Sequence, residues 1–194
     1  MKGASYNLIK RCFDFSLSLF LLIAAIFPLL IISILIKLSS EGPIIYWSDR
    51  IGLDGNLFKM PKFRTMYIGT PAVATHLLKD VKGSVTPLGK VLRRFSIDEF
   101  PQLFSILKGQ MSFVGPRPAL FNQHDLIKLR KEFKIETLVP GLTGWAQING
   151  RDNISIQEKV EFDKEYKDMK SLKLDFKIIF LTILRVFYSK NISH

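Results

Sequence analysis

The longest apolar stretch of the chain, residues 15–36, contains 22 residues and no charged side chain. As one straight helix it would be about 33 Å long, which is enough to cross a bilayer. Pro28 interrupts the stretch near its middle, where it removes a helical hydrogen bond and clashes with the carbonyl of Ala24. If the chain turned back at Phe27 and Pro28, each half would be roughly 20 Å long or less, too short to span. The pattern therefore predicts a re-entrant helix-break-helix over residues 1–40.

Basic residues on both sides of this stretch bear on its topology. Neither end is clearly the positive, cytoplasmic end of a single span, because lysines and arginines lie close to both ends. A single transmembrane anchor is the alternative, but these flanks favour two cytoplasmic ends. No small-residue cleavage site follows the stretch, so we expect the anchor to be retained. The flanking basic residues are Lys2, Lys10 and Arg11 before the stretch and Lys37, Arg50, Lys59, Lys62 and Arg64 after it.

The C-terminal segment Leu172–Tyr188 combines aliphatic and aromatic residues with Lys173, Lys177 and Arg185. Its uninterrupted apolar part, residues 178–184, is too short to cross a bilayer. Basic side chains beside aromatic ones suit the headgroup region of a membrane. The pattern indicates an interfacial amphipathic helix, with a helix packed on the domain core as the alternative.

Between these two segments the pattern changes to short elements. Residues 42–66 carry two β-prone runs around a turn-forming stretch at 52–56, which predicts a hairpin. Residues 69–84 have no clear period and indicate a loop or a short irregular helix.

The remaining part of the chain is mainly helical in pattern and then rich in turn residues. It contains no internal repeat. We therefore predict an α+β fold in which a compact, mostly helical cytoplasmic domain, residues 41–194, lies on the membrane. Helices are expected at 88–94, 100–107 and 123–136, and a turn-rich loop at 140–151.

The charge of the chain predicts an anionic partner. Lysine and arginine total 28 against 17 acidic residues, a formal net charge of +11. Nucleic acid, lipid headgroups and phosphorylated small molecules all fit, but the chain lacks zinc-finger spacing, an RNP-type aromatic strand and a helix-turn-helix signature. We therefore expect lipid and phosphate and no nucleic acid. A single cysteine, Cys12, and three scattered histidines argue against disulfides and structural zinc.

Two adjacent acids, Asp98 and Glu99, lie in the segment with the most reactive groups. Ser96 and Glu99 have the spacing of a capping box, and Pro101 with an apolar run follows them. The acids would then be first-turn residues that stabilise a helix dipole.

The same acids also suit chemistry at phosphorus. A carboxylate attacks phosphorus only as the anion, and a helix N-terminus near Arg93 and Arg94 favours that form of Asp98. Repulsion from Glu99 argues for a hard divalent cation such as Mg²⁺, which would also bridge diphosphate oxygens. The structural and the catalytic interpretation are compatible.

Two sets of basic residues could hold phosphate. Arg117 lies between Pro116 and Pro118, whose fixed φ angles leave its backbone few conformations, and its guanidinium can bind phosphate bidentately. Lys62 and Arg64 form a second candidate pair. The alternatives are an ordinary surface loop for Arg117 and a solvated strand face for the pair.

The stretch at 140–151 is a candidate for nucleotide contact. Gly141, Gly144 and Gly150 permit tight turns that bring backbone amides close to a ligand. Trp145 could stack on a base or lie at the membrane interface. A structural loop with a half-buried tryptophan is the alternative.

Four segments in order along the chain carry a resemblance to a known family. Together they cover nearly the whole chain and resemble the monotopic phosphoglycosyl transferases of bacterial glycoconjugate assembly, in the small form with little beyond the catalytic domain. The segments are KRCFDF before the proline-broken helix, RIGLDGNLFKMPKFRTM, LGKVLRRFSIDEFPQLFSILKGQMSFVGPRPAL and PGLTGWAQINGRD.

The resemblance implies a re-entrant helix in the cytoplasmic leaflet of the bacterial inner membrane. It also implies that Asp98 forms a covalent phosphosugar intermediate, with Mg²⁺ beside Glu99. By the same resemblance Arg93 and Arg117 hold phosphates.

The resemblance further places Gln147, Asn149 and Arg151 near the nucleotide. The expected reaction is a ping-pong transfer of a sugar 1-phosphate from a UDP-sugar to undecaprenyl phosphate. The alternative is a non-catalytic, basic membrane-bound scaffold. The apolar surface would meet membrane lipids, or a second protomer in a homodimer.

Overall fold

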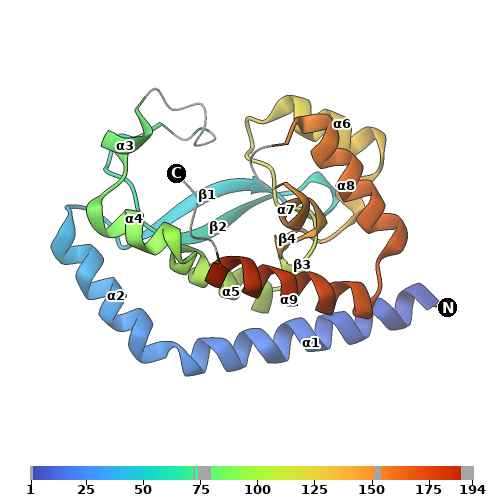
Figure 1. Cartoon of the computed structure of the whole chain (residues 1–194), viewed down its shortest axis with the longest axis horizontal. Coiled ribbons are helices and arrows are strands. Elements are labelled where there is room, and N and C mark those ends of the chain that lie inside the picture. The colour runs from blue at the N-terminus through green and yellow to red at the C-terminus, as the bar shows by residue number, and fades with distance from the viewer. Residues whose placement is uncertain (1, 72, 74–79, 151–153, 189–194) are drawn as a thin grey trace.

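The structure is a computed structural model and describes residues 2–71, 73, 80–150 and 154–188. Helices predominate in an α+β fold, as the sequence predicts (Figure 1). The elements along the chain are α1 (Lys2–Ala24), α2 (Ile26–Ser39), β1 (Ile45–Ile51), η1 (Leu53–Gly55), β2 (Leu57–Phe63), α3 (Val81–Ser84), α4 (Pro87–Arg94), η3 (Ile97–Gln102), α5 (Leu103–Leu107), β3 (Ser112–Val114), α6 (His124–Glu132), η4 (Ile135–Thr137), β4 (Gly141–Thr143), α7 (Trp145–Asn149), α8 (Ile156–Met169) and α9 (Leu172–Tyr188).

The long N-terminal helices α1 and α2 are bent by 64° at Ala25. In a continuous helix the ring of Pro28 would clash with the carbonyl of Ala24. The first helix therefore ends at Ala24, and Pro28 lies in the first turn of α2, where its missing N–H has no cost. The break lies at Ala25, which corrects the predicted position at Phe27 and Pro28.

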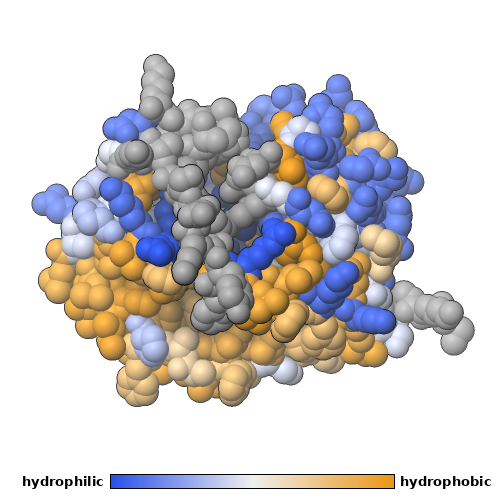
Figure 2. All heavy atoms as spheres, viewed as in Figure 1, coloured by the Kyte–Doolittle hydropathy of each residue, from blue (hydrophilic) through white to orange (hydrophobic). Residues whose placement is uncertain are grey.

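The bent pair exposes a continuous apolar surface along the lower edge of the molecule (Figure 2). Among the described helices, none is by itself long and apolar enough to cross a membrane, but α1 and α2 meet that requirement together as a bent pair. Side chains around the bend that are at least half exposed are Phe20, Ile23, Ile26, Phe27, Leu30 and Ile31.

Two arginines attach this helix pair to the rest of the protein. Arg11 of α1 donates two hydrogen bonds of 2.6 Å to the carbonyls of residues 106 and 107 at the end of α5. Arg64, just after β2, donates to the carbonyls of Ser40 and Glu41 and to the Ser40 hydroxyl, directly after α2. The first half of α1 and the residues directly after α2 are therefore fixed to the same body.

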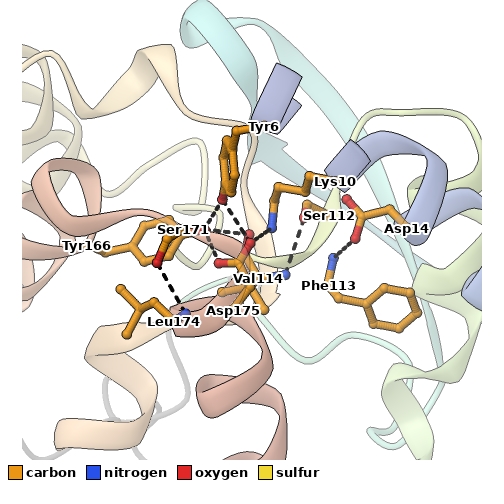
Figure 3. Close-up of polar contacts among 10 residues, drawn as sticks. All are labelled: Tyr6, Lys10, Asp14, Ser112, Phe113, Val114, Tyr166, Ser171, Leu174 and Asp175. Carbon is orange, nitrogen blue, oxygen red and sulfur yellow. Dashed lines mark hydrogen bonds and ion pairs between the residues drawn. The ribbon is translucent and has the colours of Figure 1, made fainter. Parts of the chain in front are cut away.

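A buried polar cluster adds a second attachment between α1 and the C-terminal helices (Figure 3). Asp175 of α9 accepts hydrogen bonds from Tyr6 at 2.8 Å, from Lys10 at 2.7 Å and from Tyr166 of α8 at 2.8 Å. Asp14 accepts a hydrogen bond of 3.1 Å from a main-chain amide of β3. Because these groups are shielded from water, each bond fixes the position of α1 more strongly than a surface contact would.

The antiparallel hairpin of β1 and β2 confirms the predicted one. Its turn contains Asp54 and Gly55 at positive φ angles, in the region between the strands that the sequence indicated. The register pairs Tyr46 with Lys62 and Arg50 with Phe58, so these four side chains belong to one face of the hairpin. Strand β2 packs on η3.

A second, parallel sheet of β3 and β4 lies where the sequence predicts only a loop for residues 140–151. In this sheet the backbones of the neighbouring segments approach each other closely. A Cβ on Gly115, Gly141 or Gly144 would lie within 2.4 Å of a main-chain atom of the neighbouring segment. The glycines are therefore required for space, and the predicted turn-rich loop is instead β4 followed by α7.

The C-terminal helix α9 has two different faces. Asp175 and Ile178 point into the protein and are buried, whereas Phe176, Phe180 and Ile183 are at least half exposed. One face of α9 thus packs on the core, as the alternative interpretation expects, and the other leaves aromatic residues exposed. A position of α9 in the membrane interface stays a prediction. The preceding α8 begins with a capping box of Ser155 and Glu158, which our sequence analysis did not predict.

The contacts of Arg64 predict that it stabilises the end of α2. Arg64→Ala removes a charged donor from the carbonyls of Ser40 and Glu41 and should lower the free energy of unfolding by about 2–4 kcal/mol. The measurement is urea unfolding of the purified protein in detergent. Lys59→Ala is the matched control, because its ion pair with Asp49 is exposed and 3.9 Å long. An equal effect of both variants would contradict the assigned role of Arg64.

Candidate active site

The two acids of the predicted site lie in the short 3-10 helix η3, between α4 and α5. Ser96, which precedes η3, has a φ angle of +55° and its side chain caps no backbone amide. Glu99 turns instead toward two cations from other segments. The predicted capping box of Ser96 and Glu99 is therefore wrong, although both Asp98 and Glu99 do lie in the first turn of a helix.

Glu99 binds both cations through one oxygen. Its Oε1 accepts a hydrogen bond of 2.8 Å from Nζ of Lys62 and one of 2.6 Å from Nη2 of Arg117. These two ion pairs outweigh the effect of burial and hold the pKa of Glu99 far below its usual range. Lys62, Glu99 and Arg117 thus come together from β2, η3 and the Pro-Arg-Pro segment. Phosphate binding by Lys62 and Arg117, and metal binding by Glu99, stay predictions.

Asp98 has the opposite electrostatic balance. Its side chain is buried, and this burial raises its pKa, with a further contribution from the charge of Glu99. Lys62, Arg93 and Arg117 oppose the shift. The protein by itself therefore does not favour the Asp98 anion, contrary to the expectation from a helix N-terminus near Arg93 and Arg94. Additional positive charge, such as a bound cation, would lower this pKa.

Arg117 is held by a chain of buried contacts. Its carbonyl accepts a hydrogen bond of 2.8 Å from Arg130 of α6. Arg130 in turn donates from Nε and Nη2 to Asp163 of α8, at 3.0 and 2.6 Å. Arg130 and Asp163 are both buried, so α6 and α8 fix the backbone from which Arg117 reaches Glu99. Sequence reasoning did not find this pair, because its two members are 33 residues apart.

Arg50 is a site residue that the sequence analysis did not single out for chemistry. It follows from the hairpin, since a turn at residues 52–56 pairs Arg50 with Phe58 and puts it on the face of Lys62. Its Nε donates to Oγ of Ser48 at 2.9 Å and its Nη1 to the carbonyl of Pro118 at 3.1 Å. Arg50 therefore lies against the Pro-Arg-Pro segment.

Other predicted residues lie elsewhere or have different contacts. Arg64 is buried and donates to the residues after α2, so the structure gives it a structural position and does not support the prediction that it binds phosphate. Asn149 donates to the carbonyl of Trp145 at 2.8 Å. Both amide atoms of Gln147 are buried and have no hydrogen-bond partner among the described residues. Arg151 lies outside the described residues, and a role of this segment at the nucleotide stays a prediction.

The acidic pair offers the carboxylate oxygens that a hard divalent cation prefers. The hydrogen bonds from Lys62 and Arg117 are both made to Oε1 of Glu99, and neither is made to its other carboxylate oxygen, Oε2. Within the described parts of the chain, no cluster of three or more His, Cys, Asp or Glu residues is suited to a metal ion. Mg²⁺ ordinarily binds one or two carboxylates and completes its shell with water and substrate phosphates. Asp98 and Glu99 fit an ion bound in that way.

With this fold and site, the chain belongs to the bacterial sugar transferase family, whose sequence profile matches residues 5–189. Members of this family are sugar transferases. The curated proteins that are similar to this chain are likewise named as sugar transferases or sugar phosphotransferases.

The uncharacterized sugar transferase EpsL of Bacillus subtilis (strain 168) is 39% identical over 186 residues, which cover 96% of this chain and 91% of EpsL. The UDP-glucose:undecaprenyl-phosphate glucose-1-phosphate transferase of Escherichia coli (strain K12) is 40% identical over 95% of this chain and 41% of its own length. The UDP-N-acetylgalactosamine-undecaprenyl-phosphate N-acetylgalactosaminephosphotransferase of Aeromonas hydrophila is 36% identical over 92% and 43%. This chain thus spans nearly all of EpsL and less than half of the other two relatives.

The opposite pKa shifts of the two acids predict opposite effects on stability. The folded protein disfavours the Asp98 anion, so Asp98→Asn should leave the free energy of unfolding unchanged or increase it at pH 7. The folded protein favours the Glu99 anion. Glu99→Gln should therefore lower the free energy of unfolding by about 2–4 kcal/mol, because it leaves Lys62 and Arg117 without their counter-charge. Urea unfolding in EDTA measures both. A larger loss for Asp98→Asn than for Glu99→Gln would contradict this description of the site.

Proposed function

We propose that this chain transfers a sugar 1-phosphate from a UDP-sugar to undecaprenyl phosphate and thereby starts the assembly of a bacterial glycoconjugate. The observation that carries the proposal is the buried Asp98 beside Glu99, which Lys62 and Arg117 bind from both sides, in a member of the bacterial sugar transferase family. Relatives are named for the transfer of glucose and of N-acetylgalactosamine. Because these sugars differ, the proposal covers UDP-sugars as a class.

The proposed reaction has two displacements at one phosphorus atom. In the first, a carboxylate oxygen of Asp98 attacks the sugar-bearing phosphorus, and the bridging oxygen leaves with uridine monophosphate. In the second, a phosphate oxygen of undecaprenyl phosphate attacks the same phosphorus, and the bond to Asp98 breaks. Both nucleophiles are anions, so neither displacement requires a general base. The product is a lipid diphosphate sugar, and Asp98 is restored as a carboxylate.

The cations around Asp98 support this chemistry. Lys62, Arg93 and Arg117 all favour its anion electrostatically, which opposes the effect of burial. The same positive groups are suited to the charge that builds up on the leaving nucleotide. Mg²⁺ bound at Glu99 would supply further neutralisation of the diphosphate. The site therefore combines a nucleophile shielded from water with fixed positive charge around it.

We further propose that α1 and α2 enter the cytoplasmic leaflet of the bacterial inner membrane and turn back within it. Arg11 attaches α1 to α5, and Arg64 attaches the residues after α2 to the end of β2. A transmembrane path would need these two attachments on opposite sides of the bilayer, although both belong to one body. The exposed apolar side chains at the bend are the part of the pair that would lie deepest.

The outer face of α9 fits the same membrane surface. Phe176 and Phe180 are more than half exposed, and the exposed Lys173 and Lys177 lie beside them, one turn apart. Aromatic and basic side chains in this arrangement suit the headgroup region. We propose that α9 lies in the interface while its inner face stays packed on the core.

The covalent step is tested by incubating the purified protein with a UDP-sugar labelled in the sugar, in the absence of lipid. The wild-type protein should acquire label and release uridine monophosphate in equal amounts, and undecaprenyl phosphate should then remove the label. Asp98→Asn should acquire none, whereas Asp125→Asn, which changes an exposed acid of α6, should label normally. Undiminished labelling of Asp98→Asn would exclude Asp98 as the nucleophile.

The re-entrant path is tested with single cysteines. Cys12 is the only cysteine of the chain, so Cys12→Ser provides a background for Ser5→Cys in α1 and Glu41→Cys after α2. An impermeant maleimide should label neither position in intact spheroplasts and both in permeabilised ones, because both ends lie in the cytoplasm. Labelling of just one of the two positions from outside would show a membrane-spanning path instead.

A further inference from the structure

Arg50 is a partly buried cation without an acidic partner in contact. Its side chain donates to the hydroxyl of Ser48 and to the main-chain carbonyl of Pro118. Among the ion pairs of the described residues, none includes Arg50, and Glu99 already binds Lys62 and Arg117. Burial and the charge of Arg117 lower the pKa of Arg50 to about 10, so it remains protonated at neutral pH.

The position of Arg50 beside Arg117 contributes little to the stability of the folded protein. A buried charge is costly unless an opposite charge compensates it, and two neighbouring guanidinium groups repel each other. Arg50 and Arg117 are both positive and close enough to affect one another. An anion bound between them would remove both penalties, so their position indicates a binding site for an anion.

The position of Arg50 relative to the two acids indicates which anion it binds. Arg50 donates to the carbonyl of Pro118, the residue after Arg117, and Arg117 itself donates to Glu99. Arg50 therefore lies beside the segment from which Arg117 reaches Glu99. A group that binds the phosphate under attack would have to lie close to Asp98.

We infer that Arg50 binds the nucleotide-side phosphate of the donor, the one that leaves as uridine monophosphate. Its Nε and Nη1 are fixed by Ser48 and Pro118, which leaves Nη2 to donate to a phosphate oxygen. This role rests on the proposed function, because it needs a nucleotide diphosphate in the site. Arg50 would then stabilise the negative charge that develops on the leaving group.

The role of Arg50 is tested by the binding of uridine monophosphate and of uridine to the purified full-length protein. Arg50→Gln should weaken binding of uridine monophosphate by roughly 10- to 100-fold, as expected for loss of a charge-assisted contact, and should leave uridine binding unchanged. The KM for undecaprenyl phosphate should not change. Arg94→Gln, an exposed change on α4, is the matched control.

Two further measurements separate this role from a structural one. Ser48→Ala removes the partner of Arg50 Nε and should weaken binding of uridine monophosphate by about two- to tenfold, which keeps the test available if Arg50→Gln does not fold. Equal binding of the nucleotide by folded Arg50→Gln and wild type, or an equal loss for uridine, would overturn the inference. A wild-type protein that acquires no label from a UDP-sugar would instead overturn the proposed function.

Discussion

One carboxylate oxygen, Oε1 of Glu99, joins three segments that are distant along the chain. Lys62 comes from a strand of the hairpin and Arg117 from the segment between two prolines, and both end on this atom within 2.8 Å. Each cation reaches Glu99 only because other contacts fix its backbone: the hairpin register for Lys62, and the hydrogen bond from Arg130 for Arg117. Without this carboxylate the positive groups would repel each other. The arrangement of charged groups around Asp98 would then be lost.

The acidic pair divides the work between its members. Lys62 and Arg117 keep Glu99 ionised, whereas burial removes water from around the carboxyl group of Asp98. A stable anion is a good ligand for cations and a poor nucleophile, whereas an anion that the protein solvates badly is more reactive toward phosphorus. Two chemically similar neighbours therefore acquire different properties from their surroundings, and their order along the chain alone does not reveal which is which.

The sequence predicted those features that depend on local pattern. The hairpin, the helices near 88–94 and 123–136, and the break of the N-terminal helix all follow from turn residues, apolar period or one proline. The acidic pair with Lys62 and Arg117 was also identified. Features that depend on contacts between distant segments were missed or wrong: the parallel sheet built on Gly115 and Gly141, the structural position of Arg64, and Arg50 as part of the site. A local period carries no information about such contacts.

Arg11 of α1 and Arg64 after β2 attach the bent helix pair to the rest of the protein through main-chain carbonyls. The helix α5, which accepts the hydrogen bonds of Arg11, directly follows η3, which carries Asp98. The bent helix pair is thus bonded to the helical segment that contains Asp98. In the proposed membrane setting, the height of Asp98 above the acyl chains is a fixed dimension of the protein. A lipid phosphate diffusing in the plane of the leaflet would meet the carboxylate without having to be lifted out of the bilayer.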